Sequence, residues 1–124
     1  MYIAEPRQIP HGVFAYTLHP TRLAMLKDGA TPEERTLAGE HWAYSQDLLR
    51  RHVVIFAGRT VSTTADSFAL LVIRAPSLEA ATAIAANDPA VRGGVFRMAV
   101  YPYQPMLMDS WPPEAAFIAE SPSE

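Results

Sequence analysis

The apolar and polar positions of this chain alternate between a period of two, typical of strands, and a spacing of three to four, typical of helices. From Gly12 to Leu18 (GVFAYTL), β-branched and aromatic residues fill both alternating sets, which predicts a first strand that ends before Pro20. Residues Thr21 to Ala30 hold a short apolar cluster and then an Asp-Gly breaker. We expect a loop with about one helical turn there.

The clearest helix start follows this loop. Thr31 precedes a proline and has Glu34 three residues on, which is the spacing of a capping box with proline in the first helical position. The helix is expected to run to about Arg51, because apolar and aromatic residues recur along it at spacings of three and four. That stripe consists of Leu37, His41, Tyr44 and Leu48. His41 is therefore predicted to point where the leucines point.

Two further strands are predicted after this helix. Val53 to Ala57 (VVIFA) is a continuous apolar run, which is typical of a strand covered on both faces. The mostly small and polar residues from Val61 to Asp66 are consistent with a hairpin connection, and Ser67 to Ile73 (SFALLVI) is expected to be the third strand.

A second helix, a turn and a strand entry lie within Ser77 to Phe96 (SLEAATAIAANDPAVRGGVF). Ser77 has the residue type of an N-cap, and small apolar residues follow it at helical spacing. Because Pro89 bars Asp88 from ordinary helical geometry, the helix is predicted to end there. Two glycines then form a turn before a fourth strand, Val95 to Tyr103.

The order strand, helix, strand, strand, helix, strand predicts an α+β fold of the ferredoxin-like, split βαβ type (βαββαβ). In this fold a four-stranded antiparallel sheet carries two helices on one face. The other face would be left bare, so we expect a homodimer in which two sheets face each other as a dimeric α+β barrel. A single domain is expected over residues 1–124, with an extended lead-in at 1–11 and an irregular tail at 104–124.

Composition narrows the classes of partner. With 124 residues, 49% of them hydrophobic and 19% charged, the chain can bury one core. The net charge of −3 and the scattered arginines give no reason to expect nucleic acid or an anionic membrane surface. No signal sequence or membrane-length apolar run is seen, so a cytoplasmic location is expected. Cysteine is absent, which excludes disulfides and thiolate metal sites.

Asp88 is the charged residue whose predicted position requires a compensating partner. At the C-terminal end of a helix the macrodipole disfavours a negative charge, and His41 on the neighbouring helix could compensate it. A paired carboxylate would also fix the tautomer of the imidazole and leave one nitrogen as a base. The alternative is that His41 is a core histidine bonded to a backbone carbonyl and that Asp88 only caps the turn that follows it.

These residues carry a resemblance. The segments TPEERTLAGEHWAYSQDLL, VVIFAGRT and SLEAATAIAANDPAVRGGVF, with a last strand ending in YPY, are similar to the YCII-related family over Gly12 to Met106. Its most specific parts are the pair His41 and Tyr44, the Ala-Gly turn at position 57, and the Asp-Pro at position 88 followed by Gly93. The resemblance implies a ferredoxin-like dimer in which His41 and Asp88 form an acid-base dyad lining one pocket.

Three other residues are candidates for binding a substrate. Tyr44 lies one helical turn from His41 and could hydrogen-bond a ligand oxygen, although such a tyrosine is more often a core residue. Arg59 replaces the proline that usually follows the Ala-Gly turn in the family, and it could offer a cation to an anionic substrate. Ser67, at the entry of the third strand, is a weaker candidate. The remaining histidines show no ligand spacing, so no metal and no cofactor are expected.

Two functions remain open from the sequence. In the first, the protein is a small cofactor-independent enzyme that uses the dyad for proton transfer on a small cyclic or aromatic substrate, as an isomerase or lyase. In the second, it is a non-catalytic module that binds a small ligand or another molecule, and the dyad is a structural hydrogen bond between two helices. A cavity beside His41 would favour the first.

Overall fold

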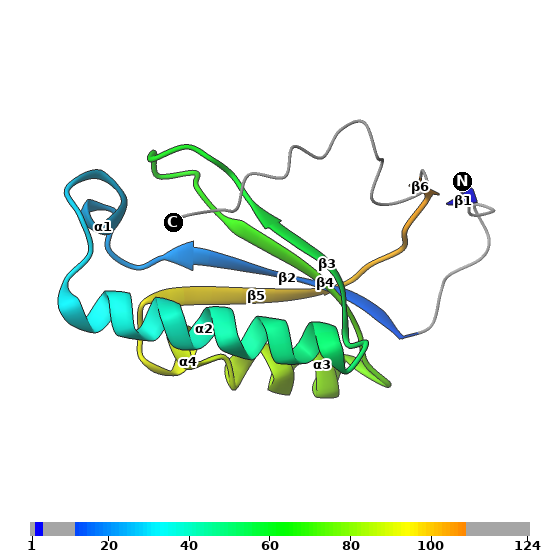
Figure 1. The fold of residues 1–124 in the computed structure, drawn as a ribbon. Coiled ribbons are helices and arrows are strands. Elements are labelled where there is room, and N and C mark those ends of the chain that lie inside the picture. The colour runs from blue at the N-terminus through cyan, green and yellow to red at the C-terminus, as the bar shows by residue number, and fades with distance from the viewer. Residues whose placement is uncertain (1, 4–11, 109–124) are drawn as a thin grey trace. The chain divides into compact units, whose positions relative to one another are not determined.

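Four antiparallel strands form the sheet on which the main part of the chain is built (Figure 1). The computed structural model describes residues 2–3 and 12–108. The sheet has the order β3-β4-β2-β5, so the first strand lies between the third and the fourth, as in the ferredoxin-like plan. This confirms the predicted fold class. The strands are β2 (Val13–Pro20), β3 (Val54–Arg59), β4 (Ala69–Arg74) and β5 (Phe96–Pro102).

Three of the four described helices lie on one face of this sheet, and the first, a single turn, lies in the loop that follows β2 (Figure 1). On the central strand β2, alternate residues point to that face, and Phe14, Tyr16 and Leu18 are buried there with Leu71 and Ile73 of β4. The same core includes residues of two helices, namely Leu48, Ala81 and Ala85. The helices are α1 (Ala24–Lys27), α2 (Pro32–Arg50), α3 (Leu78–Ala86) and α4 (Pro89–Arg92).

The helix starts follow the local signals in the sequence. At α2 the Thr31 side chain accepts a hydrogen bond from the Glu34 amide, and the Glu34 side chain accepts one from the Thr31 amide. The predicted capping box is therefore present. Ser77 caps α3 by accepting from the Ala80 amide. The single helical turn expected before α2 is α1.

The second predicted strand is in a different environment from the expected one. The run VVIFA was expected to be covered on both faces, but β3 lies at an edge of the sheet and only Val54 in it is buried. Phe56 keeps 37% of its surface exposed. The prediction is wrong because an apolar run reports the residue types of a strand and not its position in the sheet. In the sheet, β3 pairs with β4 on one side only. The other side of β4 pairs with β2, which is distant in sequence, and this pairing leaves β3 at the edge.

A second, separate unit contains two short strands from the two ends of the chain. They are β1 (Tyr2–Ile3) and β6 (Leu107–Met108), which pair antiparallel with Tyr2 opposite Met108. The expected extended lead-in and irregular tail did not include this pairing, because two-residue strands leave no period to detect. The remaining predicted lead-in residues, and the tail after Met108, lie outside the described residues.

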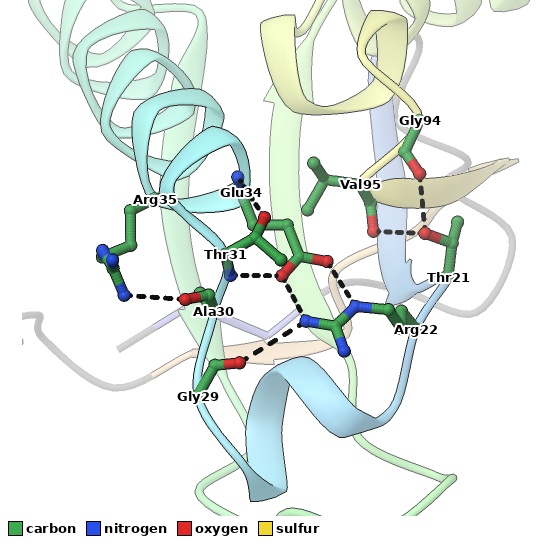
Figure 2. Close-up of polar contacts among 9 residues, drawn as sticks. All are labelled: Thr21, Arg22, Gly29, Ala30, Thr31, Glu34, Arg35, Gly94 and Val95. Atoms are coloured by element: carbon green, nitrogen blue, oxygen red, sulfur yellow. Dashed lines mark hydrogen bonds and ion pairs between the residues drawn. The ribbon is translucent and has the colours of Figure 1, made fainter.

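A polar network holds the loop between β2 and α2 in place (Figure 2). Arg22 binds both carboxylate oxygens of Glu34, at 2.6 and 2.8 Å, and a further guanidinium contact reaches the carbonyl of Gly29. The Thr21 hydroxyl lies 2.6 Å from the carbonyl of Gly94, in the turn before β5. The loop thereby joins the start of α2 to the start of β5. Both elements carry residues of the site described below.

Glu34 should make stability depend on pH in acid. Hydrogen bonds from Arg22, and then from the Thr31 backbone, lower the pKa of Glu34 from 4.5 to about 2. A carboxyl whose pKa is lower in the folded state stabilises the fold above its unfolded pKa of 4.5, and this contribution is lost as the pH falls through about 2. Glu34→Gln keeps a residue that can complete the capping box but removes the ion pair.

We therefore expect Glu34→Gln to lower the midpoint of thermal unfolding at neutral pH and to converge with the wild type near pH 2. Calorimetry or circular dichroism from pH 7 to pH 2 measures this. Glu33→Gln, one residue earlier and also in the first turn of α2, is the matched control. A deficit of the Glu34 variant that stays constant across the whole range would contradict the assignment.

Candidate active site

His41 reaches the interior of the protein from the middle of α2. It shares a helix face with Leu37 and Leu48, and Leu48 is buried in the core. The turn after α4 approaches this face so closely that a Cβ atom at Gly93 would lie 2.5 Å from Leu37 Cδ1. Only glycine allows this approach without movement of the leucine. The approach brings α4 and the start of β5 beside the first half of α2.

Asp88 follows directly on the end of α3, as predicted, and it also begins the next helix. Helix α3 ends at Ala86 with Asn87 as its C-cap, and Asp88 is the N-cap of the next helix, α4. Its Oδ1 accepts a hydrogen bond from the Ala90 amide at 3.0 Å. The carboxylate thus lies at the C-terminal end of α3, as expected, but the prediction did not include the helix that starts at this residue. Pro89 begins a new helix, as proline in the first helical position often does, so the charge lies at the favourable end.

His41 and Asp88 are nevertheless in direct contact. The Nδ1 atom of His41 lies 2.6 Å from Oδ2 of Asp88, a short distance typical of a charge-assisted hydrogen bond. The Asp88 side chain is fully buried, whereas the His41 side chain keeps 18% of its surface exposed. Each carboxylate oxygen of Asp88 thus accepts one hydrogen bond, one from α2 and one from α4.

This geometry fixes the tautomer of His41. An ionised carboxylate has no proton to donate, so Nδ1 carries the hydrogen and, in the neutral ring, Nε2 has the free lone pair. Within the described part of the chain, Nε2 makes no hydrogen bond. The ring lies edge-on to Phe96 of β5, with centroids 5.8 Å apart and planes at 71°. The imidazole is thus oriented on two sides, by Asp88 and by Phe96.

Tyr44 lies one turn further along α2 and joins it to α3. Its hydroxyl donates a hydrogen bond of 2.7 Å to the carbonyl of Ile84. Burial, and then the negative charge of Asp88, raise the pKa of the Tyr44 phenol, so it stays a neutral donor. The hydroxyl oxygen can still accept one hydrogen bond from another group.

The other two predicted site residues lie on the β3–β4 hairpin. Arg59 ends β3 and is exposed. Ser67 is 4% exposed, and its hydroxyl binds the carbonyl of Ser62 at 2.7 Å within the hairpin. Neither residue makes a described contact with His41 or Asp88. The structure therefore joins only two of the five predicted site residues to each other.

One cavity of the described residues lies away from the dyad. An open depression of about 420 Å³ is lined by Gly12, Val13, Arg74, Ala75 and Pro76. This is the end of β2 where Val13 pairs with Arg74, whereas Phe96, which contacts His41, pairs with the other end of β2 at Pro20. The depression is therefore not the pocket that the resemblance implied. Among the described residues, no cluster of three His, Asp or Glu side chains could hold a metal ion.

Phe96 is a site residue that the sequence analysis did not single out. It lies on the alternating face of β5 that also presents Met98 and Val100 to the core. Its place on that face could be predicted from the period of two. Its contact with His41 could not, because the contact depends on how far α2 extends over the end of the sheet.

The chain is similar to known proteins at two levels, a family of domains and a solved structure. The YCII-related domain matches residues 18–106, which confirms the resemblance predicted from the sequence. A search of curated proteins gives no match. Among solved structures, the chain is similar to 5-chloro-2-hydroxyhydroquinone dehydrochlorinase (TftG) from Burkholderia phenoliruptrix AC1100, in complex with 2,5-dihydroxybenzoquinone.

The structural match has a TM-score of 0.54 and 17% sequence identity, and it covers 73% of this chain and 93% of the other. At this identity the likeness concerns the fold. No helix among residues 2–3 and 12–108 is both long and apolar enough to span a membrane.

The two roles of Asp88 can be separated by substitution. Asp88→Asn keeps a good N-cap, but with its oxygen on the Ala90 amide its NH₂ group can donate to Nδ1 of His41 only if the ring moves its hydrogen to Nε2, and the charge of the carboxylate is lost. We expect it to lower the free energy of unfolding by about 1.5–3 kcal/mol, the cost of a hydrogen bond to a charged group. Asp88→Ala also loses the cap, so we expect a further loss of about 1 kcal/mol.

Urea denaturation followed by circular dichroism measures this difference. Asp47, a half-exposed aspartate on α2 that pairs with arginines, gives the control Asp47→Asn, which should change the free energy of unfolding by less than about 0.5 kcal/mol. Equal losses for the Asn and Ala variants of Asp88 would show that the cap contributes nothing.

Proposed function

This chain belongs to the YCII-related family, and we propose that it is an enzyme in which His41, oriented by Asp88, moves a proton on a small cyclic or aromatic molecule. The reaction would be an isomerisation or an elimination of the lyase type. It needs one base, held in one tautomer, next to the bound substrate. No step of such a reaction requires a cofactor.

The contact of 2.6 Å between His41 Nδ1 and Asp88 Oδ2 is the observation that carries this proposal. Buried side-chain nitrogens in proteins usually have a hydrogen-bond partner, in the protein or in ordered water. His41 instead has one nitrogen bonded to a buried carboxylate and the other without a described partner, on a side chain that is 18% exposed. This is the arrangement of a general base with an orienting acid.

The similar dehydrochlorinase supports the choice of substrate class. That protein is a 5-chloro-2-hydroxyhydroquinone dehydrochlorinase, and its structure is a complex with 2,5-dihydroxybenzoquinone. For this chain we propose the same general chemistry. His41 Nε2 would accept a proton from the substrate, and the electron pair of the broken bond would move into the ring system. A leaving group would then depart, or a proton would return at another position.

The three other predicted site residues differ in where they lie relative to His41 and Asp88. Tyr44 lies beside the dyad, and its oxygen can accept a hydrogen bond from a substrate hydroxyl. Arg59 and Ser67 belong to the β3–β4 hairpin and would meet a substrate only if it extended to that hairpin. We propose Tyr44 as the first of the three to test.

A non-catalytic binding module is the second candidate function. It is favoured by one observation, that the described depression lies at the opposite end of β2 from Phe96, the β5 residue that contacts His41. In this case His41 would serve to compensate the buried charge of Asp88. Substitution of His41 would then change stability and leave the bound ligand unaffected.

We also propose a homodimer that covers the sheet face opposite the helices. That face carries a row formed by Gly58, Leu70, Thr17 and Ala99, and a second row in which Phe56 and Tyr101 flank the buried Val72 and Ala15. Phe56 and Tyr101 are 37% and 53% exposed. A second copy of the chain offers a surface of the same kind, so twofold pairing would bury both apolar faces.

His41→Asn tests the catalytic proposal. We expect it to lower kcat by about 10²–10⁴, the usual contribution of a general base, while the protein stays folded. The assay measures chloride release and absorbance changes with 5-chloro-2-hydroxyhydroquinone and a panel of related halogenated hydroquinones as probes. A substrate that the variant converts at the wild-type rate would rule out His41 as the base.

His52→Asn is the matched control for this substitution. His52 follows α2 and has a φ of +62°, a conformation that asparagine tolerates well, and its exposed side chain makes no contact that the structure describes. It should retain both turnover and stability. If no probe is converted, the next measurement is binding of 2,5-dihydroxybenzoquinone, detected by changes in amide chemical shifts. Binding would indicate a ligand-binding module, and its absence would indicate a protein with no affinity for this class of molecule.

Leu70→Glu tests the proposed dimer. Leu70 is half-buried at the centre of the open face, so a charge there should not disturb the helix side but should prevent an apolar interface. We expect light scattering to give a dimer mass for the wild type and a monomer mass for the variant. A monomeric wild type at micromolar concentration would contradict the proposal.

A further inference from the structure

Thr21 holds the turn that precedes β5 with both its side chain and its backbone (Figure 2). Its hydroxyl lies 2.6 Å from the carbonyl oxygen of Gly94 and 3.0 Å from that of Val95. Its amide also donates a hydrogen bond of 3.0 Å to the Val95 carbonyl. One hydroxyl hydrogen can be shared between two neighbouring carbonyls as a three-centre bond. Two successive peptide groups of the turn are thus bound to one residue.

The pairing of β2 with β5 becomes weaker at this turn. The paired strands end at Pro20 and Phe96, and beyond them only the Thr21 amide donates across to Val95. The Val95 amide donates instead to the carbonyl of Ala90 in α4, at 2.9 Å. Gly94 has a φ of +78°, and a glycine at this position leaves the unfolded turn a wide range of conformations. The hydroxyl of Thr21 therefore adds a bond where the strand pairing supplies few.

The turn sets the position of Phe96, which follows Val95 directly. The Phe96 ring lies edge-on to the imidazole of His41, with centroids 5.8 Å apart. Asp88 holds the imidazole at one atom, Nδ1, and a single hydrogen bond leaves a ring able to tilt about it. The aromatic contact limits this tilt from a second side. A shift of the turn before β5 would therefore be passed to His41 through one peptide bond and one ring contact.

Arg22 connects the same segment to the helix that carries His41. Its guanidinium binds both carboxylate oxygens of Glu34, in the first turn of α2. Thr21 and Arg22 are adjacent, so one short segment holds both the start of α2 and the start of β5 (Figure 2). The imidazole comes from the first of these elements and the ring that contacts it comes from the second.

We propose that Thr21 is a positioning residue of the site, whose hydroxyl holds the turn before β5 and thereby keeps Phe96 against the ring of His41. Thr21 acts through Phe96 and does not itself contact the imidazole. Its consequence for turnover rests on the proposed function, because it matters only if His41 is the base. Its effect on the two rings in the ligand-free protein does not depend on that function.

The experiment compares the rings of His41 and Phe96 by NMR in the ligand-free, full-length protein. Nuclear Overhauser effects between the rings report their separation, and the His41 ring protons report the ring current of Phe96. Thr21→Val keeps the branched shape but removes the hydroxyl. We expect it to weaken the ring-to-ring effects and to shift the His41 ring protons toward their values in Phe96→Leu, which lacks the aromatic ring. Thr21 is exposed, so the variant should stay folded.

Thr21→Ser restores the hydroxyl and should return both signals to their wild-type values. In the turnover assay with the halogenated hydroquinone probes, Thr21→Val should lower kcat by about fivefold and leave KM nearly unchanged. This factor corresponds to about 1 kcal/mol, the usual net contribution of one hydrogen bond. The NMR comparison decides the proposal whether or not a probe is converted.

Thr36→Val is the matched control. Thr36 is also exposed, and its hydroxyl also donates to a backbone carbonyl, that of Pro32 at 3.0 Å within α2. This variant should leave the signals of both rings unchanged. Wild-type ring signals in Thr21→Val, or an equal change in Thr36→Val, would overturn the proposal and leave the catalytic role of His41 open. Unimpaired turnover in His41→Asn would instead refute the catalytic proposal without bearing on the position of Phe96.

Discussion

The buried charge of Asp88 is the constraint on which the rest of the site depends. A carboxylate with no exposed surface is expensive to keep ionised unless strong hydrogen bonds compensate it. Here the Ala90 amide supplies one and His41 supplies the other at 2.6 Å. The first fixes the start of α4 and the second fixes α2 against it. One side chain therefore sets both the packing of two helices and the orientation of the imidazole.

Much of this could be predicted from the sequence because it depends on neighbouring residues. The capping box at Thr31 and the stripe through His41 are local signals, and both are present in the structure. The fold class could be predicted from the order of helices and strands, because few sheet topologies accommodate that order with short connections. The pairing of His41 with Asp88 followed from fold and charge together, although the two residues are 47 positions apart.

What could not be predicted depends on contacts between distant segments. The position of β3 at the sheet edge and the contact of Phe96 with His41 follow from register and from how the helices lie over the sheet. Asp88 is instructive, because its pairing was predicted from an incomplete premise. Its charge was taken to be unfavourable at the end of α3, whereas it caps α4. It needs a second partner because it is buried, a property that no local pattern reports.

The catalytic and structural interpretations agree on the bond at Nδ1 and differ only at Nε2. Besides the Ala90 amide, compensation of the buried carboxylate requires one more donor. An amide or a hydroxyl side chain could provide that hydrogen bond, but neither can accept a proton at neutral pH. Histidine adds a second nitrogen at the far side of the ring, which Asp88 cannot reach. Phe96 contacts the ring edge-on, and part of the side chain remains exposed. A structural role explains why Asp88 has a partner, and under the catalytic interpretation Nε2 is the reason that this partner is an imidazole.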